Sequence, residues 1–224
     1  MGYFVRACRA AYENAARKRG VSGRRFLHGA GAAAAILSAF GLASCSASPP
    51  AVTSPPPGFV SGRVTAIGDS VMLAAKPDLV AQIPNVTVDA VVGRQWGAGL
   101  ALARHLRATN SLGTTVIIEL GTNGPVDASQ FQLMMSALSG ATLVVFDTVH
   151  VPSSYSWWQS VNATLREGVA KYANARLADF NSLGNANPQW FGSDGIHMVI
   201  GGPGAQAMAS LIARTIKAAE GRLP

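Results

Sequence analysis

The sequence predicts an α/β protein, a three-layer α/β/α sandwich built around a central five-stranded parallel sheet. Short runs of β-branched and apolar residues alternate along the chain with longer segments of helical periodicity. That alternation is typical of a parallel sheet covered by helices on both faces. A chain of 224 residues, 49% of them hydrophobic and 13% charged, can bury one domain and is too short for two ordinary domains and a leader.

The expected strands and helices follow one another in regular order. Strands are expected over residues 64–67, 86–92, 115–120, 141–147 and 176–180. Helices are expected over residues 72–82, 98–108, 129–137, 159–173 and 204–219. We expect the strands to lie in flavodoxin-like order. Because crossovers between parallel strands are right-handed, the loops that follow the strands meet at one edge of the sheet, where ligands bind.

The positive charge of the chain is concentrated at its N-terminus. Seven basic residues and one acidic residue precede Cys45, whereas 11 basic and 10 acidic residues follow from there on, in a chain of net charge +7. The body of the protein is therefore almost neutral, and the charge does not favour a nucleic-acid partner.

Residues 1–44 have the features of an export signal. Arg24 and Arg25 precede an apolar run over residues 29–42, whose 14 residues fall short of the roughly 20 that a membrane-spanning helix needs. The run ends in Leu42-Ala43-Ser44-Cys45, which resembles the bacterial lipobox that is cleaved before a lipidated cysteine. The paired arginines also resemble a twin-arginine export signal. Ordinary cleavage after a small residue, with the cysteine unmodified, is the alternative.

Residues 45–61 are expected to form a lipid-anchored tether. Five prolines lie among small residues between Ser46 and Gly58, a composition that favours an extended chain. The two cysteines, Cys8 and Cys45, both precede the expected domain, which therefore has no disulfide and no cysteine ligand for zinc. We expect a domain over residues 62–224, held at the outer face of the cell membrane.

Three polar motifs fall where the loops of the sheet should meet. Gly68-Asp69-Ser70 follows the first strand, Gly121-Thr122-Asn123-Gly124 follows the third, and Asp194-Gly195-Ile196-His197 precedes the last helix. A serine hydroxyl becomes nucleophilic when an imidazole removes its proton, and the imidazole needs a carboxylate to orient it. The sequence therefore predicts an acyl-transfer site with Ser70, His197 and Asp194 as its triad.

The motifs resemble those of the SGNH (GDSL-type) hydrolases over about residues 62–220. That family has a Ser in a GDS motif, a Gly in a second block, an Asn in a GxN block and D-x-x-H near the C-terminus. The matching residues here are Ser70, Gly93, Asn123, and Asp194 with His197. The resemblance implies an oxyanion hole made by the backbone N–H groups of Ser70 and Gly93 and the side chain of Asn123. It implies no cofactor and no metal.

The motifs resemble one branch of the family more closely. Residues 68–73, 92–95 and 119–124 look like the SGNH domains of bacterial cell-envelope O-acetyltransferases, although Arg94-Gln95 stands where many members have a small polar residue. The resemblance implies a serine esterase or acyltransferase that acts on O-acetyl groups of a glycan. Its substrate would be an acylated glycan or a small ester, and a membrane acyltransferase is a candidate partner. The alternative is a non-catalytic envelope lipoprotein that uses the fold for binding or assembly.

Several of these residues also have a structural interpretation. A Gly-Asp-Ser sequence is common in turns and helix caps, and Asp69 is expected to hold such a turn. Asn123 could serve a left-handed turn beside Gly124. Glu119 is expected to be a buried structural acid.

Other candidate residues carry weaker signals. His150 could line the cleft, but it has no acid at the spacing that Asp194 has to His197. The histidines are too scattered to suggest a metal site. Trp157 and Trp158 fit either a sugar-facing rim or a hydrophobic cap on the following helix. No G-x-S-x-G elbow surrounds Ser70, and no dinucleotide or Walker-type loop is present.

The lipobox predicts that the mature chain begins at a lipid-modified Cys45. Mass spectrometry of the protein from its membrane fraction should find the N-terminal peptide starting at this residue with a mass increased by lipid. An unmodified Cys45 lying inside the mature chain would refute the prediction.

Overall fold

The computed structural model describes residues 62–221. The expected export signal, the lipidation site Cys45 and the tether lie outside the described residues. Five strands are present: β1 (Val64–Gly68), β2 (Val86–Ala90), β3 (Thr115–Glu119), β4 (Leu143–Asp147) and β5 (Ala175–Ala178). The helices are α2 (Ser70–Gln82), α3 (Trp96–Ala108), α4 (Ala128–Ala137), α5 (Trp158–Val169), α6 (Phe180–Ala186) and α7 (Pro203–Glu220), with a 3₁₀ turn η1 (Pro188–Trp190).

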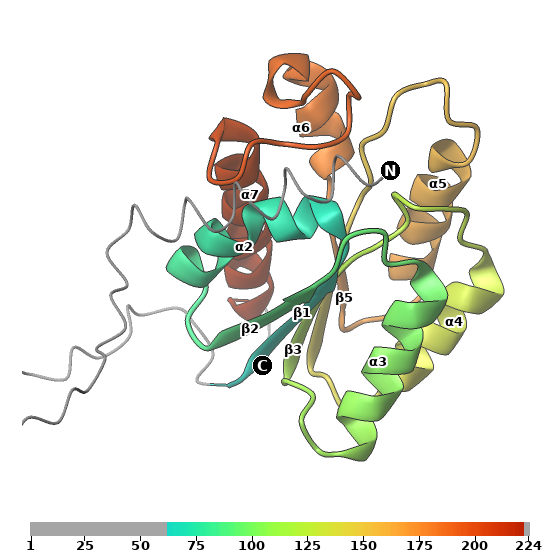
Figure 1. Cartoon of the computed structure of the whole chain (residues 1–224). Coiled ribbons are helices and arrows are strands. Elements are labelled where there is room, and N and C mark those ends of the chain that lie inside the picture. Colours follow the sequence, from blue (N-terminus) through green and yellow to red (C-terminus); the bar gives the residue numbers. More distant parts are fainter. Residues whose placement is uncertain (1–61, 222–224) are drawn as a thin grey trace, which may run out of the picture. The chain divides into compact units, whose positions relative to one another are not determined.

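All five strands are parallel and lie in the order β2-β1-β3-β4-β5. This is the flavodoxin-like order, so the predicted fold class is confirmed. Helices α2 and α7 cover one face of the sheet, and α3, α4 and α5 cover the other (Figure 1). The strand order reverses at β1, between β2 and β3, and ligands of such sheets bind beyond the carboxyl ends of the strands at that point.

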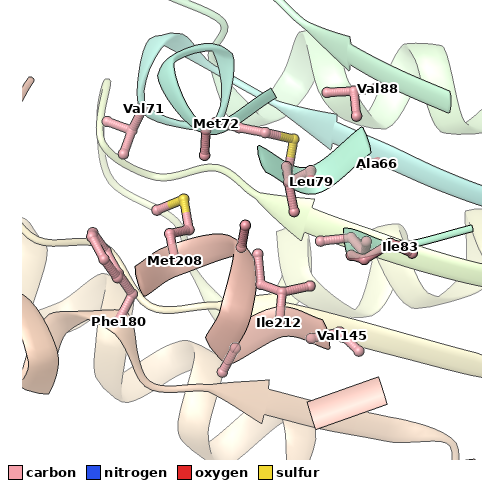
Figure 2. Close-up of a cluster of buried hydrophobic side chains, with 14 of the residues drawn as sticks. Ala66, Val71, Met72, Leu79, Ile83, Val88, Val145, Phe180, Met208 and Ile212 are labelled. Atoms are coloured by element: carbon pink, nitrogen blue, oxygen red, sulfur yellow. The ribbon is translucent and has the colours of Figure 1, made fainter. Parts of the chain in front are cut away.

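The three central strands consist mostly of apolar and β-branched residues, which suits strands that are covered by helices on both faces. All residues of β1, β3 and β4 are buried, whereas β2 and β5 at the edges are partly exposed. Successive side chains of a strand point to opposite faces, so Ile117 and Val145 pack beneath α2 and α7, while Ile118 and Phe146 pack beneath the helices opposite. Figure 2 shows part of the hydrophobic cluster between the sheet and helices α2 and α7. Met72 of α2 and Met208 of α7 belong to this cluster.

The structure differs from the sequence-based expectation between β5 and α7. Two short elements, α6 and η1, fill a segment for which no helix was expected. Seven residues are too few to show helical periodicity, and α6 depends on tertiary contacts. Asp179 caps it by accepting from the Ser182 N–H at 3.4 Å, and Thr148 holds Asp179 through a 2.9 Å hydrogen bond. Helix α5 also ends at Val169, four residues before the expected end.

No helix within residues 62–221 combines the length and the apolar character needed to cross a membrane.

Three acidic side chains are buried at the C-terminal ends of the strands: Asp69, Glu119 and Asp147. Burial raises the pKa of Asp147 well above its ordinary value, and the charge of Asp179 raises it further. The nearby backbone of Phe180 and Thr148 opposes this shift without reversing it, and within residues 62–221 neither carboxyl oxygen of Asp147 has a hydrogen-bond partner. The Asp147 carboxyl is therefore held in its neutral form more strongly in the folded protein than in the unfolded chain.

We predict that Asp147→Asn relieves a loss of stability at high pH. The pKa of the folded state lies above that of the unfolded state, so the unfolded chain releases its proton first. The wild-type protein consequently loses stability as the pH rises from the ordinary aspartate pKa through the raised one, by about 1.4 kcal/mol for each pKa unit. Denaturant unfolding at pH 4 and pH 8 measures this effect. The free energy of unfolding of Asp147→Asn, relative to that of the wild type, should be larger at pH 8 than at pH 4.

Asp127→Asn is the opposite control for that measurement. Hydrogen bonds from the Gln130 N–H and the Ser129 hydroxyl lower the pKa of this exposed helix-capping carboxyl. Its contribution is present above the ordinary aspartate pKa of 3.8 and is lost as the pH falls below that value, so Asp127→Asn should not gain on the wild type between pH 4 and pH 8. Equal pH dependence of unfolding in the Asp147→Asn variant and the wild type would contradict the prediction.

Candidate active site

Ser70 lies at the junction of β1 and α2. It is the first residue of the helix, and Asp69 caps the helix by accepting from the Val71 N–H at 2.9 Å. The Leu73 N–H donates to the Asp69 carbonyl at 3.0 Å and begins the regular helical ladder. The serine therefore sits at the positive end of the helix dipole, where negative charge is stabilised.

The three residues of the predicted triad are in hydrogen-bonding contact. The Ser70 Oγ lies 2.9 Å from His197 Nε2, and His197 Nδ1 lies 2.7 Å from Asp194 Oδ2. In the tautomer with the proton on Nδ1, the imidazole donates to Asp194 and its Nε2 accepts the serine proton. The chain of bonds has the geometry that general-base activation of a serine requires.

Asp194 is held in place by the loop that carries the histidine. Its Oδ1 accepts from the backbone N–H groups of Ile196 and His197, each at 3.0 Å. Partial burial favours a higher pKa for Asp194, but these two bonds and the interaction with His197 outweigh it, so the pKa lies below its ordinary value. The carboxylate is thus ionised when it orients the imidazole.

The loop itself depends on a glycine. Gly195 has φ +67, and a Cβ built on it would lie 2.7 Å from Pro152 Cγ. Both the left-handed backbone and the close contact favour glycine at this position. The Gly192 N–H donates to the His197 carbonyl at 2.8 Å, which closes the loop between Asp194 and His197.

The predicted oxyanion donors lie at the start of α2, in the turn after β2 and in the turn after β3. Within residues 62–221, neither the Ser70 N–H nor the Gly93 N–H has a hydrogen-bond acceptor. Gly93 has φ +74, lies exposed in the turn after β2, and lines an open cavity with Val91 and Gln95. The backbone amides of Ser70 and Gly93 are thus available to a ligand.

The Asn123 side chain is already engaged. Its Nδ2 donates to Asp69 Oδ2 at 2.9 Å and makes a longer contact of 3.4 Å with the Arg94 carbonyl. The first bond fixes the plane of the amide, and the second proton is held only weakly. In this structure the Asn123 side chain therefore has a structural role, and its function as an oxyanion donor stays a prediction.

Arg94 explains the unusual second block of the sequence. Its Nη1 donates to the Gly68 carbonyl at 3.1 Å, and its Nη2 forms an ion pair with Asp89 Oδ1 at 2.6 Å. The Val91 N–H also donates to the Gly68 carbonyl, at 3.2 Å. Arg94 therefore ties the turn that carries Gly93 to the residue two positions before the nucleophile. The departure from a small polar residue was visible in the sequence, but its bonding partners were not.

His150 lies apart from this chain of hydrogen bonds. Its ring stacks on Phe191 with centroids 4.2 Å apart. Burial lowers the pKa of His150, and the nearby backbone of Asn181 opposes this shift without reversing it. His150 thus packs against the start of the loop that carries Asp194 and His197.

The two adjacent tryptophans pack against the core. Trp157 and Trp158 are partly buried against hydrophobic clusters, and Trp157 Nε1 donates to the Gly121 carbonyl at 3.3 Å. Of the two interpretations drawn from the sequence, this favours the hydrophobic cap. Within residues 62–221 no group of three or more His, Cys, Asp or Glu side chains could hold a metal ion.

Proteins with related sequences are peptidoglycan O-acetyltransferases by name. The chain is 36% identical over 161 residues to YrhL of Bacillus subtilis, named as such an enzyme, which covers 72% of this chain and 25% of that protein. It is 33% identical over 156 residues to the peptidoglycan O-acetyltransferase OatA of Listeria monocytogenes, covering 70% of this chain and 24% of that protein. The chain thus spans about a quarter of the length of these relatives. No family model matches the sequence.

Solved structures show the same fold. The C-terminal catalytic domain of Streptococcus pneumoniae peptidoglycan O-acetyltransferase A, with a methylsulfonyl adduct, superimposes with a TM-score of 0.65 at 23% identity, covering 71% of this chain and 94% of that domain. A member of the lipolytic G-D-S-L family from Veillonella parvula superimposes with a TM-score of 0.55 at 16% identity, covering 68% and 96%.

The geometry predicts that the two histidines near the site have unequal effects on turnover. His197→Ala removes the group bonded to Ser70 Oγ and should lower kcat for an ester substrate by about 10,000-fold or more. His150→Ala removes only packing and should leave kcat within about tenfold of the wild type. Steady-state kinetics of both variants, with circular dichroism as a check on folding, measures the difference. Equal losses of kcat would show that the base is wrongly assigned.

Proposed function

This chain belongs with the SGNH (GDSL-type) hydrolases by fold and with the peptidoglycan O-acetyltransferases by sequence, and on that premise we propose that it is a serine-dependent esterase or O-acetyltransferase. The observation that carries the proposal is the hydrogen-bonded chain from Ser70 Oγ through His197 to Asp194. Asp194 is ionised and orients His197, and Ser70 stands at a helix N-terminus with a backbone N–H that has no acceptor in the described part of the chain.

The first half-reaction would form an acyl-enzyme. His197 Nε2 takes the proton of Ser70 as Oγ attacks the ester carbonyl, and Asp194 stabilises the imidazolium that results. The negative charge on the carbonyl oxygen is met by the backbone N–H groups of Ser70 and Gly93 and by the Asn123 amide. Collapse of the intermediate expels the alcohol, which takes the proton from His197, and leaves the acyl group on Ser70.

The second half-reaction decides between hydrolysis and transfer. Water or a sugar hydroxyl attacks the acyl-enzyme, with His197 again acting as the base, and Ser70 regains its proton. Both outcomes use the same residues, so the nature of the acceptor distinguishes an esterase from a transferase. The names of the relatives favour an acetyl group as the acyl unit and a cell-wall glycan as its donor or acceptor.

The same proposal places the enzyme outside the cell. An export signal over residues 1–44 and a lipidated Cys45 would hold the domain at the outer face of the membrane on its proline-rich tether. A cell-wall glycan and a membrane acyltransferase would both be within reach there. The alternative, a non-catalytic binding lipoprotein, gives no reason for the bonded chain of Ser70, His197 and Asp194.

Turnover of a chromogenic acetyl ester by the full chain tests the proposal. The wild type should release the chromophore, Ser70→Ala should fall to the uncatalysed rate, and mass spectrometry should detect an acetyl group on Ser70 of the wild type during turnover. Product analysis with and without a peptidoglycan fragment as acceptor then separates transfer from hydrolysis. Equal turnover by the wild type and Ser70→Ala would refute the proposal.

Asn123→Ala should act mainly on the transition state. An amide donor interacts more strongly with a developing oxyanion than with a neutral carbonyl, so kcat should fall by roughly 100- to 1,000-fold with a smaller change in KM. Asn123→Asp should be at least as damaging, because it sets a carboxylate against Asp69 as well as against the oxyanion. If Asn123→Ala instead unfolds the protein, and the fraction that refolds has a normal kcat, Asn123 is only a turn residue.

A further inference from the structure

The first turn of α2 has an unusual set of hydrogen bonds. The first four backbone N–H groups of a helix have no partner within the helix and need acceptors elsewhere. At α2 these are the N–H groups of Asp69, Ser70, Val71 and Met72. Asp69 Oδ1 accepts from Val71, and Glu119 Oε2 accepts from Met72 at 3.1 Å and from Asp69 at 3.4 Å. Two carboxyl groups therefore accept from three of the four amides, and within residues 62–221 the Ser70 N–H has no acceptor.

We propose that Glu119 is a positioning residue for the oxyanion hole: by accepting from the amides of Asp69 and Met72, on either side of Ser70, it fixes the first turn of α2 so that, of the four amides of that turn, the Ser70 N–H is the one left for the substrate. This role rests on the proposed function, because it concerns the reaction of Ser70. Glu119 touches neither substrate nor reacting atoms and acts through the backbone of α2.

Glu119 reaches the helix because of its place in the sheet. It is the last residue of β3, and the β1–β3 register sets it beside Gly68. A Cβ on Gly68 would lie 2.4 Å from Met72 Cβ, so the glycine allows the start of α2 to approach the strand ends. Glu119 is only 1% exposed, and its other oxygen, Oε1, lies 3.4 Å from the oxygen of the Thr122 hydroxyl.

The arrangement favours a neutral carboxyl at Glu119. Burial raises the pKa of Glu119 well above its ordinary value, and the neighbouring acids Asp69 and Asp147 raise it further, against the hydrogen bonds from the backbone of Asp69 and Met72. A full negative charge beneath the oxyanion hole would oppose the charge that develops there. Accepting backbone N–H groups does not require that charge, since a neutral carbonyl oxygen accepts them as well.

This distinction sets the variants for the test. Glu119→Gln keeps a carbonyl oxygen for the two amides and can donate its NH2 to the Thr122 hydroxyl. Glu119→Asp keeps the carboxyl but withdraws it from the amides by about 1.5 Å, one carbon–carbon bond. Glu119→Ala removes the acceptor. Asp147→Asn is the matched control, because it changes a buried acid on the adjacent strand that contacts no amide of α2.

Kinetics of the full chain on a chromogenic acetyl ester should separate positioning from folding. We expect Glu119→Ala and Glu119→Asp to lower kcat by about 10- to 100-fold with KM within about threefold, since a donor displaced by about 1 Å loses much of its effect. Glu119→Gln and Asp147→Asn should keep kcat within about threefold. If Glu119→Asp is as active as the wild type, or if Glu119→Gln loses as much kcat as Glu119→Asp, the inference is wrong.

Hydrogen exchange measured by NMR tests the same inference without turnover. The Met72 amide should be protected in the wild type and in Glu119→Gln and should exchange faster in Glu119→Asp, while the Ser70 amide exchanges fast in all three. Unchanged protection of Met72 in Glu119→Asp would overturn the inference even if Glu119→Ala fails to fold. The comparison of Ser70→Ala with the wild type tests the proposed function separately. The proposed function and the inference about Glu119 can therefore fail independently.

Discussion

The site depends on how helix α2 begins at the end of β1. A parallel strand that passes directly into a helix leaves four amides exposed at the helix start, and here that start is buried against the sheet. Unpaired buried amides cost free energy, so acceptors must be built in from elsewhere. Asp69 and Glu119 supply them. The consequence is that one amide, that of Ser70, remains available at the positive end of the helix.

The same region explains why the three polar motifs depend on one another. Asp69 caps the helix with one oxygen and holds the Asn123 amide with the other. Burial raises the pKa of Asp69 to about 6, although hydrogen bonds from the Val71 N–H and the Asn123 side chain oppose the rise. The carboxyl that shapes the nucleophile's turn therefore also orients the proposed oxyanion donor on the next strand.

The loop with the base is assembled differently. Asp194 and His197 are close in sequence, and most of the contacts that orient them lie within that loop. Its position relative to Ser70, however, depends on packing, including the contact of Gly195 with Pro152 and the stacking of Phe191 on His150. A local motif thus fixes the acid–base pair, and the fold brings that pair within 2.9 Å of the serine 127 residues earlier in the chain.

The sequence by itself determined the fold class, the order of the major elements and the identity of the residues that meet at Ser70. Those features follow from hydrophobic periodicity and from motifs of a few residues, which are local properties of a chain. Only the tertiary structure decided the short helix α6 and the hydrogen-bond partners of Arg94 and Glu119. Each of these depends on contacts between segments far apart in sequence, such as the 47 residues between Met72 and Glu119. A backbone amide that is left without a partner has no signature in the sequence, because it is defined by where every other acceptor lies.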